Sequence, residues 1–470
     1  MKSPTKILLF LFISLILFNC TKEDEVPDLS DRRFNNQPEL NNYLRAFTDP
    51  NELFISLLHD RPVTDNKSTL INDVNTISTP SIRTSFTNGM EYGIIAEPGS
   101  TTNVLGYAHY ILPNSDAEAN NIKRGDFFYG VNDTQLTRDN YRTLLANTDY
   151  TLNMAIFDGI KVEEDSLRTP TDTIPKKIIL SKSGYTHKPV FITKNFVNGA
   201  DNIGYLMYNH DFSTTYLNDL NNAFLELKNF GVNQLILDLR YNVGGGSSID
   251  NINQLASMIT GQFKDQTFAK KKWNSKAQPW FEANQPDSLI TKFTDKLYNS
   301  NTINSLELTD VYIILNGSSS SSIEVLTNSL RSYINVHLVN YTNTVGNNTG
   351  SITLYNSIDY DSIGRSINHD VVLQPIAFEI LNNDDETFEN GFSPEIRTCI
   401  YEDILKLGVL GEESDPVLST LYNTLIGNPL PPGFLWCNTM NNFEVLFNSV
   451  NQYRIFDTGI IIEQDLPNTN

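Results

Sequence analysis

The alternation of strand-like and helix-like segments after residue 187 is the feature that most constrains the fold. The chain runs from the apolar NIGYLMY through TYLNDLNNAFLELKNFG, which has apolar residues at helical spacing, to VNQLILDL and then IDNINQLASMITG. Strands buried on both faces of a sheet are apolar throughout, and their alternation with helices indicates crossover connections. We therefore predict an α/β core for this region.

Length and charge limit the number of domains and the class of partner. A chain of 470 residues is too long for one compact core, which indicates two or three domains. Asp and Glu number 55 against 34 Lys and Arg, giving a net charge of −21. Because proteins bind nucleic acid largely through Lys and Arg on the phosphates, we expect no nucleic-acid partner.

Composition shifts divide the chain further. Residues 36–83 contain PELNNYLRAFTDPNELFISLL, whose spacing predicts an N-terminal helical segment. Residues 84–186 have the pattern of short strands separated by Gly, Pro and Asn. The α/β core spans residues 187–430, so the whole is a multidomain α+β protein. Residues 431–470 form a C-terminal extension to which the sequence assigns no place.

The first twenty residues have the pattern of a secretory signal. Two lysines precede an apolar run from Ile7 to Phe18, which is too short for a comfortable membrane span. The run ends at Cys20, and a polar tether, residues 21–35, follows. This arrangement resembles a bacterial lipoprotein signal, which implies lipidation of Cys20 and anchoring to the outer membrane, facing the periplasm or the cell surface. An ordinary cleaved signal or an N-terminal anchor is the alternative.

The cysteines and histidines form no metal-binding pattern. Cys20, Cys399 and Cys437 make no CxxC pair, and the six histidines are scattered without an HExxH motif. We therefore predict no metal site and no cofactor. Cys399 and Cys437 can pair if the compartment is oxidising, or remain two separate thiols.

Part of the segment 84–186 resembles a PDZ domain of the bacterial protease type. The matching stretches are ILPNSDAEANNIKRGD, a strand, turn and short helix, and GVNDTQLT, the next strand and hairpin. PDZ domains bind an extended peptide as an added strand. The strand implied to bind it comprises Tyr92, Gly93, Ile94 and Ile95. Glu91 beside them would repel a terminal carboxylate, and the alternative role for the domain is to brace the core.

The stretch LILDLRYNVGGGSS, residues 235–248, ends an apolar strand in a glycine-rich turn. It has neither GxGxxG spacing nor a GK[ST] sequence, so nucleotide binding is not expected. It resembles the DLR-x-N-x-GG signature of C-terminal processing (tail-specific) serine peptidases, as do NIGYLMYNHDF upstream and VVLQPIAFEILNN and GFSPE downstream. The resemblance implies a ClpP/crotonase-like peptidase core, with the N–H of Gly244 or Gly245 in an oxyanion hole.

Five consecutive serines, residues 318–322, precede IEVL. The peptidase family carries its nucleophile three residues before a glutamate, and Glu324 with the ungapped VLTNSLRSYINV sets that register here. The resemblance therefore implies that Ser321 is the nucleophile and that Ser322 supplies a second oxyanion N–H. A serine at the start of a helix also gains from the helix dipole, which stabilises an oxyanion.

The residue that should activate this serine is missing. The family base is a lysine in a T-[FYV]-G-K motif, and the matching stretch here is TVGNNTG, with Asn347 at the lysine position. No lysine lies between Lys296 and Lys406. An asparagine amide cannot take a proton near neutral pH, whereas a serine nucleophile needs a base within reach. His337 and His369 are the alternative bases in this half of the chain.

Two functions are compatible with these residues. The first is a serine endopeptidase of the C-terminal processing family that acts on extended or unfolded polypeptides, weak or inactive for want of the base. The second is a non-catalytic peptide-binding or scaffold lipoprotein on the same fold. In both, the partners are proteins or peptides in extended form, together with a membrane reached through the lipid anchor. The sequence indicates no oligomeric state.

Overall fold

The computed structural model describes residues 69–71, 84–164, 177–242, 247–275, 277–317, 320–355, 372–397, 403–428, 443–450 and 461–463. The predicted signal with Cys20, the tether, and Cys399 and Cys437 lie outside these residues. Among the described helices, none has the length and apolar composition of a membrane-spanning segment.

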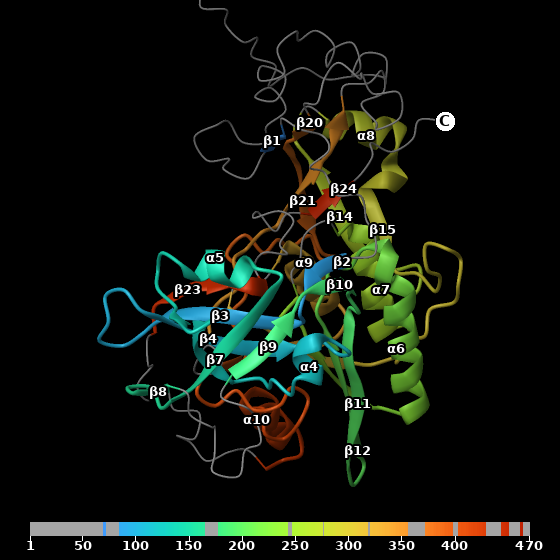
Figure 1. The fold of residues 1–470 in the computed structure, drawn as a ribbon. Helices are drawn as coiled ribbons and strands as arrows, with labels where there is room; N and C mark the ends of the chain where they lie inside the picture. Colours follow the sequence, from blue (N-terminus) through green and yellow to red (C-terminus); the bar gives the residue numbers. More distant parts are fainter. Residues whose placement is uncertain are drawn as a thin grey trace, which may run out of the picture.

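A six-stranded sheet forms the centre of the core (Figure 1). Its strands, in spatial order, are β11 (Val190–Asn198), β12 (Asp201–Tyr208), β13 (Gln234–Asp238), β16 (Asp310–Ile314), β17 (Asn335–Asn340) and β22 (Ile396–Arg397). All neighbours from β12 to β22 are parallel, and only β11 pairs antiparallel, with β12. Both faces of this sheet are covered, which explains the continuous apolar runs in the sequence.

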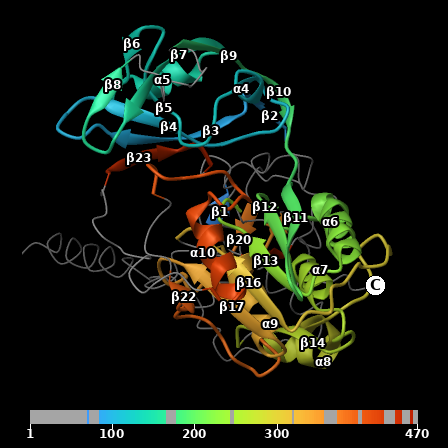
Figure 2. The same cartoon turned by 90° about the horizontal axis from the view of Figure 1, so that it is seen from below.

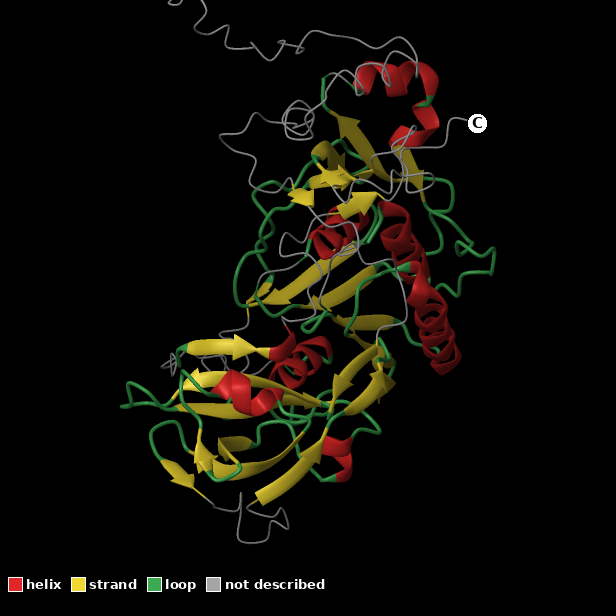
Figure 3. Ribbon diagram, turned by 45° about the horizontal axis from the view of Figure 1, so that its top comes forward, coloured by secondary structure: helices red, strands yellow, loops and turns green. Residues whose placement is uncertain are grey.

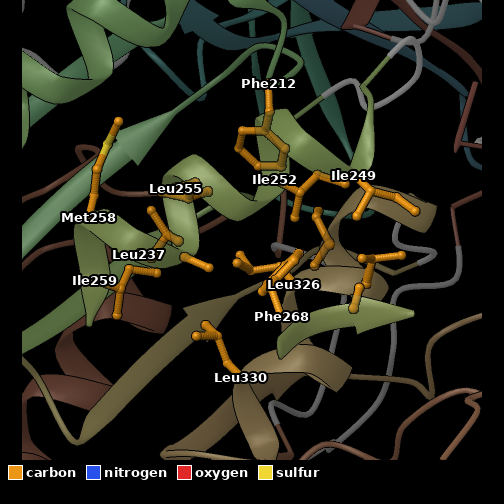
Figure 4. Close-up of a cluster of buried hydrophobic side chains, with 14 of the residues drawn as sticks. Phe212, Leu237, Ile249, Ile252, Leu255, Met258, Ile259, Phe268, Leu326 and Leu330 are labelled. Atoms are coloured by element: carbon orange, nitrogen blue, oxygen red, sulfur yellow. The ribbon is translucent and has the colours of Figure 1, made fainter. Parts of the chain in front are cut away.

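Three helices cover one face of the sheet: α6 (Leu217–Phe230), which follows the short 3-10 helix η2 (Thr214–Tyr216), α7 (Ile249–Ile259) and α9 (Ser321–Arg331). Their apolar faces meet alternate strand side chains such as Leu237 in a large buried cluster, shown with Leu255 and Leu326 in Figure 4. The other face packs against α10 (Pro416–Leu425) and the partly buried side chains of β11. The α/β prediction for this region is therefore confirmed.

A second sheet lies beyond the helices, with the strand order β15 (Ile290–Lys292), β14 (Thr267–Trp273), β21 (Ile376–Leu381), β18 (Thr349–Ile352) and β24 (Ile461–Glu463). The helix α8 (Gln278–Asn284) and the 3-10 helix η3 (Pro286–Leu289) connect β14 to β15. A three-stranded sheet joins β1 (Thr69–Ile71), β20 (Val372–Gln374) and β19 (Leu354–Tyr355). The expected helical segment 36–83 is thus wrong at residues 69–71, where backbone pairing with β20 makes a strand.

The PDZ-like segment forms its own sheet at one end of the molecule (Figure 3). Its strands are β3 (Met90–Ala96), β4 (Val104–Ile111), β5 (Phe127–Val131), β6 (Thr134–Gln135), β7 (Asp149–Phe157), β8 (Val162–Glu164) and β9 (Lys177–Ser181), with helices α4 (Asp116–Ala119) and α5 (Tyr141–Ala146). A separate apolar cluster fills it. The chain enters and leaves through a two-stranded ribbon of β2 (Thr84–Thr87) and β10 (Ser183–Thr186).

The outer strand of this sheet comes from the other end of the chain. Residues Val445–Asn448 form β23, which pairs antiparallel with β3 (Figure 2). The C-terminal extension, to which the sequence assigns no place, therefore supplies one strand to the PDZ-like sheet and another, β24, to the sheet that contains β18.

The PDZ-like domain contacts the core next to the glycine turn. Tyr241 stacks on His109 and Tyr110 of β4, at ring-centroid distances of 5.7 and 4.8 Å. Arg124 donates to the Tyr241 hydroxyl at 2.5 Å and to the His109 carbonyl at 2.5 Å. Side chains of the second domain therefore hold Tyr241, which comes just before Asn242 and the glycine turn in the sequence.

Candidate active site

The candidate site lies at the carboxyl edge of the parallel strands. Because β12, β13, β16 and β17 run parallel, the segments that follow them meet at one edge of the sheet. Those segments carry His210, the glycine turn, the serine run and Asn347, in that order. The carboxyl edge of an open parallel sheet is where α/β proteins commonly bind ligands.

Ser321 is the first residue of α9 and its side chain is completely buried. Its Oγ has no hydrogen-bond partner within the described part of the chain, nor does that of Ser320. Buried polar atoms without partners are rare in native structures and concentrate where a ligand or water binds. Ser322 follows within the first helical turn, where backbone N–H groups have no acceptor inside the helix. The two positions therefore suit a nucleophile and an oxyanion donor.

The backbone before the serines is fixed by Asn340, a residue that sequence reasoning missed. Asn340 ends β17, is fully buried, and its side chain accepts from the Gly317 amide at 3.0 Å and donates to the Gly317 carbonyl at 2.9 Å. Gly317 has φ +81°, and a Cβ there would lie 2.5 Å from the Tyr341 hydroxyl. Only glycine suits this position without strain.

Glu324 brings the Asn347 segment against the serine helix. Its buried carboxylate accepts hydrogen bonds from the amides of Gly346, at 2.6 Å, and Asn347, at 2.8 Å. Since Glu324 lies three residues after Ser321 on α9, these bonds place Asn347 beside the first turn of that helix. The glutamate that set the sequence register thus also holds the residue that the sequence pattern aligns with the family's lysine.

We expect Glu324→Gln to destabilise this segment. One carboxylate oxygen would be replaced by an NH2 group that cannot accept the amide hydrogen bond. The loss should lower the free energy of unfolding by about 1–3 kcal/mol, the cost of an unsatisfied buried group. Urea unfolding of the two proteins measures it. A Glu389→Gln variant is the control, because Glu389 carries the same carboxylate at an exposed position; equal stabilities of wild type and Glu324→Gln would contradict the assignment.

Of the two histidines proposed as substitute bases, the structure describes only His337, and it does not lie at this edge. His337 lies in β17, stacks on Tyr312 at 4.6 Å, and its Nε2 is 3.4 Å from Asp310, the first residue of β16. It therefore belongs to the amino end of the parallel strands, away from Ser321. His369 lies outside the described residues.

A third histidine, His210, does lie at the carboxyl edge. It follows β12, and the side-chain amide of Asn242 donates to its carbonyl. Its Nδ1 is 2.9 Å from the Asp211 amide and 3.1 Å from the Asp211 carboxylate. Its buried Nε2 has no partner within the described residues. In the sequence, His210 is recognisable only as part of a His-Asp dipeptide after an apolar strand. Its position at this edge follows from the parallel pairing of β12 with β13.

The DLR residues form a buried ionic cluster beside the glycine turn. Arg240 contacts Asp238 at 2.7 Å and Asp415 at 2.8 Å, and the side chains of all three are at most 1% exposed. Asp415 also caps α10 through the amides of Val417 and Leu418. Tyr205 donates to Asp238 at 2.7 Å, and burial together with the Asp238 charge raises the Tyr205 pKa well above its usual 10, which keeps it a donor. Gly244 and Gly245 themselves lie outside the described residues.

The predicted substrate-binding residues lie in β3, remote in sequence from the serine helix. Tyr92, Gly93, Ile94 and Ile95 follow one another along its edge, and on the outer side this edge pairs with β23. Glu91 is buried and accepts a hydrogen bond from Ser449 at 2.5 Å. The edge predicted to take a ligand strand thus already pairs with a strand of the same chain. Within the described residues, no cluster of His, Cys, Asp and Glu could hold a metal ion.

Comparison with known structures agrees with the fold of this chain. The crystal structure of a protein from Bacteroides fragilis NCTC 9343, described as an S41 protease, matches with a TM-score of 0.59 and 21% identity, covering 78% of this chain and 88% of that one. The photosystem II D1 C-terminal processing protease matches over 83% of this chain and 90% of its own at 15% identity, with a TM-score of 0.37. A search of curated protein sequences gives no match.

A family model matches the segments that meet at the carboxyl edge of the central sheet. The model of Peptidase family S41 matches residues 202–397, which include the DLR cluster strand, the serine helix and Asn347. The similarity of fold to the Bacteroides fragilis structure agrees with that match. Residues 202–397 are therefore similar to peptidase family S41 in sequence, and the match covers the central sheet and the helices that pack on it.

Proposed function

We propose that the protein is a serine-type peptidase of the C-terminal processing class that holds extended polypeptides, with weak or no turnover. The observation that supports this is the Glu324 carboxylate, which holds the Asn347 backbone beside the first turn of the serine helix. The framework of a serine–base pair is retained, but an amide stands at the position of the base. Removing the base from a serine peptidase costs on the order of a millionfold in turnover, with a residual rate from the oxyanion hole.

Turnover of a labelled, unfolded protein such as casein tests the proposal. We expect wild type to cleave it slowly or not at all, and any cleavage to vanish in Ser321→Ala. If His210 acts as a substitute base, His210→Ala should remove the same activity. A His337→Ala control should retain it, because His337 lies at the other end of the strands. Fast turnover that survives Ser321→Ala would exclude the proposed nucleophile.

The alternative is a non-catalytic peptide-binding or scaffold protein on the same fold. The Asn347 amide favours it, because this group cannot act as a base. Under this alternative, wild type and Ser321→Ala bind an extended peptide equally and neither cleaves it. In both cases we propose that the PDZ-like domain binds peptide strands and that a lipid on Cys20 anchors the protein to the outer membrane, as the sequence patterns indicate.

A further inference from the structure

Strand β23 occupies the edge of β3 at which a PDZ-type domain adds a ligand strand. It runs antiparallel to β3, with Val445 opposite Ile95, Phe447 opposite Ile94 and Asn448 opposite Gly93. The Ala96 amide continues the ladder by donating to the Glu444 carbonyl at 2.9 Å. Backbone pairing of this kind is how PDZ domains hold an extended peptide. The partner strand here comes from the same polypeptide, about 350 residues further along the chain.

The side chain of Phe447 fills the apolar space between β3 and helix α5. Its ring lies 5.6 Å from that of Tyr92 on β3 and 6.0 Å from that of Tyr141 on α5. Leu446 and Phe447 both pack against the apolar cluster of this domain. Val445, by contrast, is 51% exposed. One strand therefore carries an aromatic anchor, Phe447, that packs partly buried against the domain, and a neighbour, Val445, that is exposed to solvent.

Polar contacts fix both ends of the strand. Ser449 donates to Glu91 at 2.5 Å and accepts from the Tyr92 amide at 2.8 Å. At the other end, the Glu444 carboxylate pairs with Arg138 through two hydrogen bonds, of 2.9 and 2.5 Å. The position beside Glu91 is thus occupied by a neutral hydroxyl, which avoids the repulsion that a terminal carboxylate would meet there.

We propose that residues 444–449 are a built-in ligand of the PDZ-like domain, which an external peptide must displace. The inference rests on the proposed peptide-binding role of this domain and is independent of turnover. The external ligand is an internal extended segment of a polypeptide, with an acidic residue, an aromatic anchor three positions later and a serine two positions after that. Its recognition needs no free carboxyl terminus, because Glu91 takes a hydroxyl donor.

A fluorescent peptide with the sequence of residues 443–450, amidated at its end, tests the displacement on the full-length protein. Wild type should bind it weakly because its own strand fills the edge. Phe447→Asp places a charge in the apolar space, which should release the internal strand and lower the Kd of the peptide at least about tenfold. Val445→Asp adds the same charge at the exposed position of the same strand and should bind as wild type does.

Hydrogen exchange separates release of the strand from general unfolding. In Phe447→Asp, the Ala96 amide should lose protection while amides of β12 and β13 keep it, and saturating peptide should restore the protection at Ala96. The milder Phe447→Ala should show the same changes to a smaller degree. Equal peptide affinity of wild type, Phe447→Asp and Val445→Asp would overturn the proposal, as would an Ala96 amide that stays protected in Phe447→Asp.

The same peptide tests the ligand class. A version that ends at Ser449 with a free carboxylate should bind Phe447→Asp more weakly than its amidated form, because Glu91 lies beside that end. Tighter binding of the free acid would overturn recognition of an internal segment. These assays measure binding alone, so absence of proteolysis would leave their outcome unaffected, and their failure would leave the role of Ser321 intact.

Discussion

Asn347→Lys is expected to raise peptidase turnover by about 10²–10⁴-fold, the usual contribution of a positioned general base. The reason is positional: Glu324 already holds the backbone of residue 347 beside the first turn of the serine helix. Asn347 is 6% exposed, and burial disfavours the ammonium form of a lysine introduced there. Since only the neutral amine accepts a proton, turnover of the variant should rise as pH increases through the lysine pKa. Casein cleavage measured between about pH 6 and 10 provides the profile.

Two controls show whether the gain depends on this geometry. Asn348→Lys adds the same side chain at the next residue, which is 7% exposed, and should give no increase. Combining Asn347→Lys with Ser321→Ala should remove the gain entirely. A folded Asn347→Lys protein without increased turnover would show that residue 347 does not occupy the position of the family's base.

Arg240→Ala is expected to destabilise the core by about 3–5 kcal/mol, as for other buried pairs that lose one partner. The change leaves the carboxylates of Asp238 and Asp415 buried without the charge that both contact. Because Asp415 caps α10, this helix should loosen as well. Trp273 and Trp280 lie in the core and report its unfolding in urea through their fluorescence.

A surface pair provides the matched control for this effect. Lys264 and Asp295 are 2.9 Å apart, but their side chains are 51% and 49% exposed. Exposed pairs contribute little, since water screens them, so Lys264→Ala should leave the unfolding midpoint unchanged. If Arg240→Ala unfolds at the wild-type midpoint, the buried cluster does not stabilise the core.

The central sheet was predictable because its strands are buried on both faces. The segments that contain β12 and β13 are mostly apolar, and a helix separates them, so the pattern indicates an α/β core with strands buried on both faces. The spacing of the motifs likewise assigns Glu324, Ser321 and Asn347 to one register of the peptidase pattern. The structure adds the two amide hydrogen bonds that join the serine helix to residue 347.

Contacts between distant segments could not be predicted in this way. The acidic partner of Arg240 at position 415, the strand pairing of Thr69–Ile71 and the place of His210 all depend on pairings that local sequence does not specify. The apolar run in EVLFNS permits a strand but does not indicate its partner. Glu91 is recognisable from the sequence as a charge beside the binding strand, whereas the serine that contacts it lies at position 449.

The covalent attachment of β23 sets a threshold for any competitor of this strand. A ligand carried on the same chain as its site acts at an effective concentration on the order of 1 mM. A free peptide making the same contacts at about 10 μM would then occupy about one domain in a hundred. A dilute peptide with a single copy of the segment would therefore bind little, whereas a protein that carries many copies of the segment would bind more. As a built-in ligand, β23 would thus make the domain selective for ligands that present many copies of the segment over single copies at low concentration.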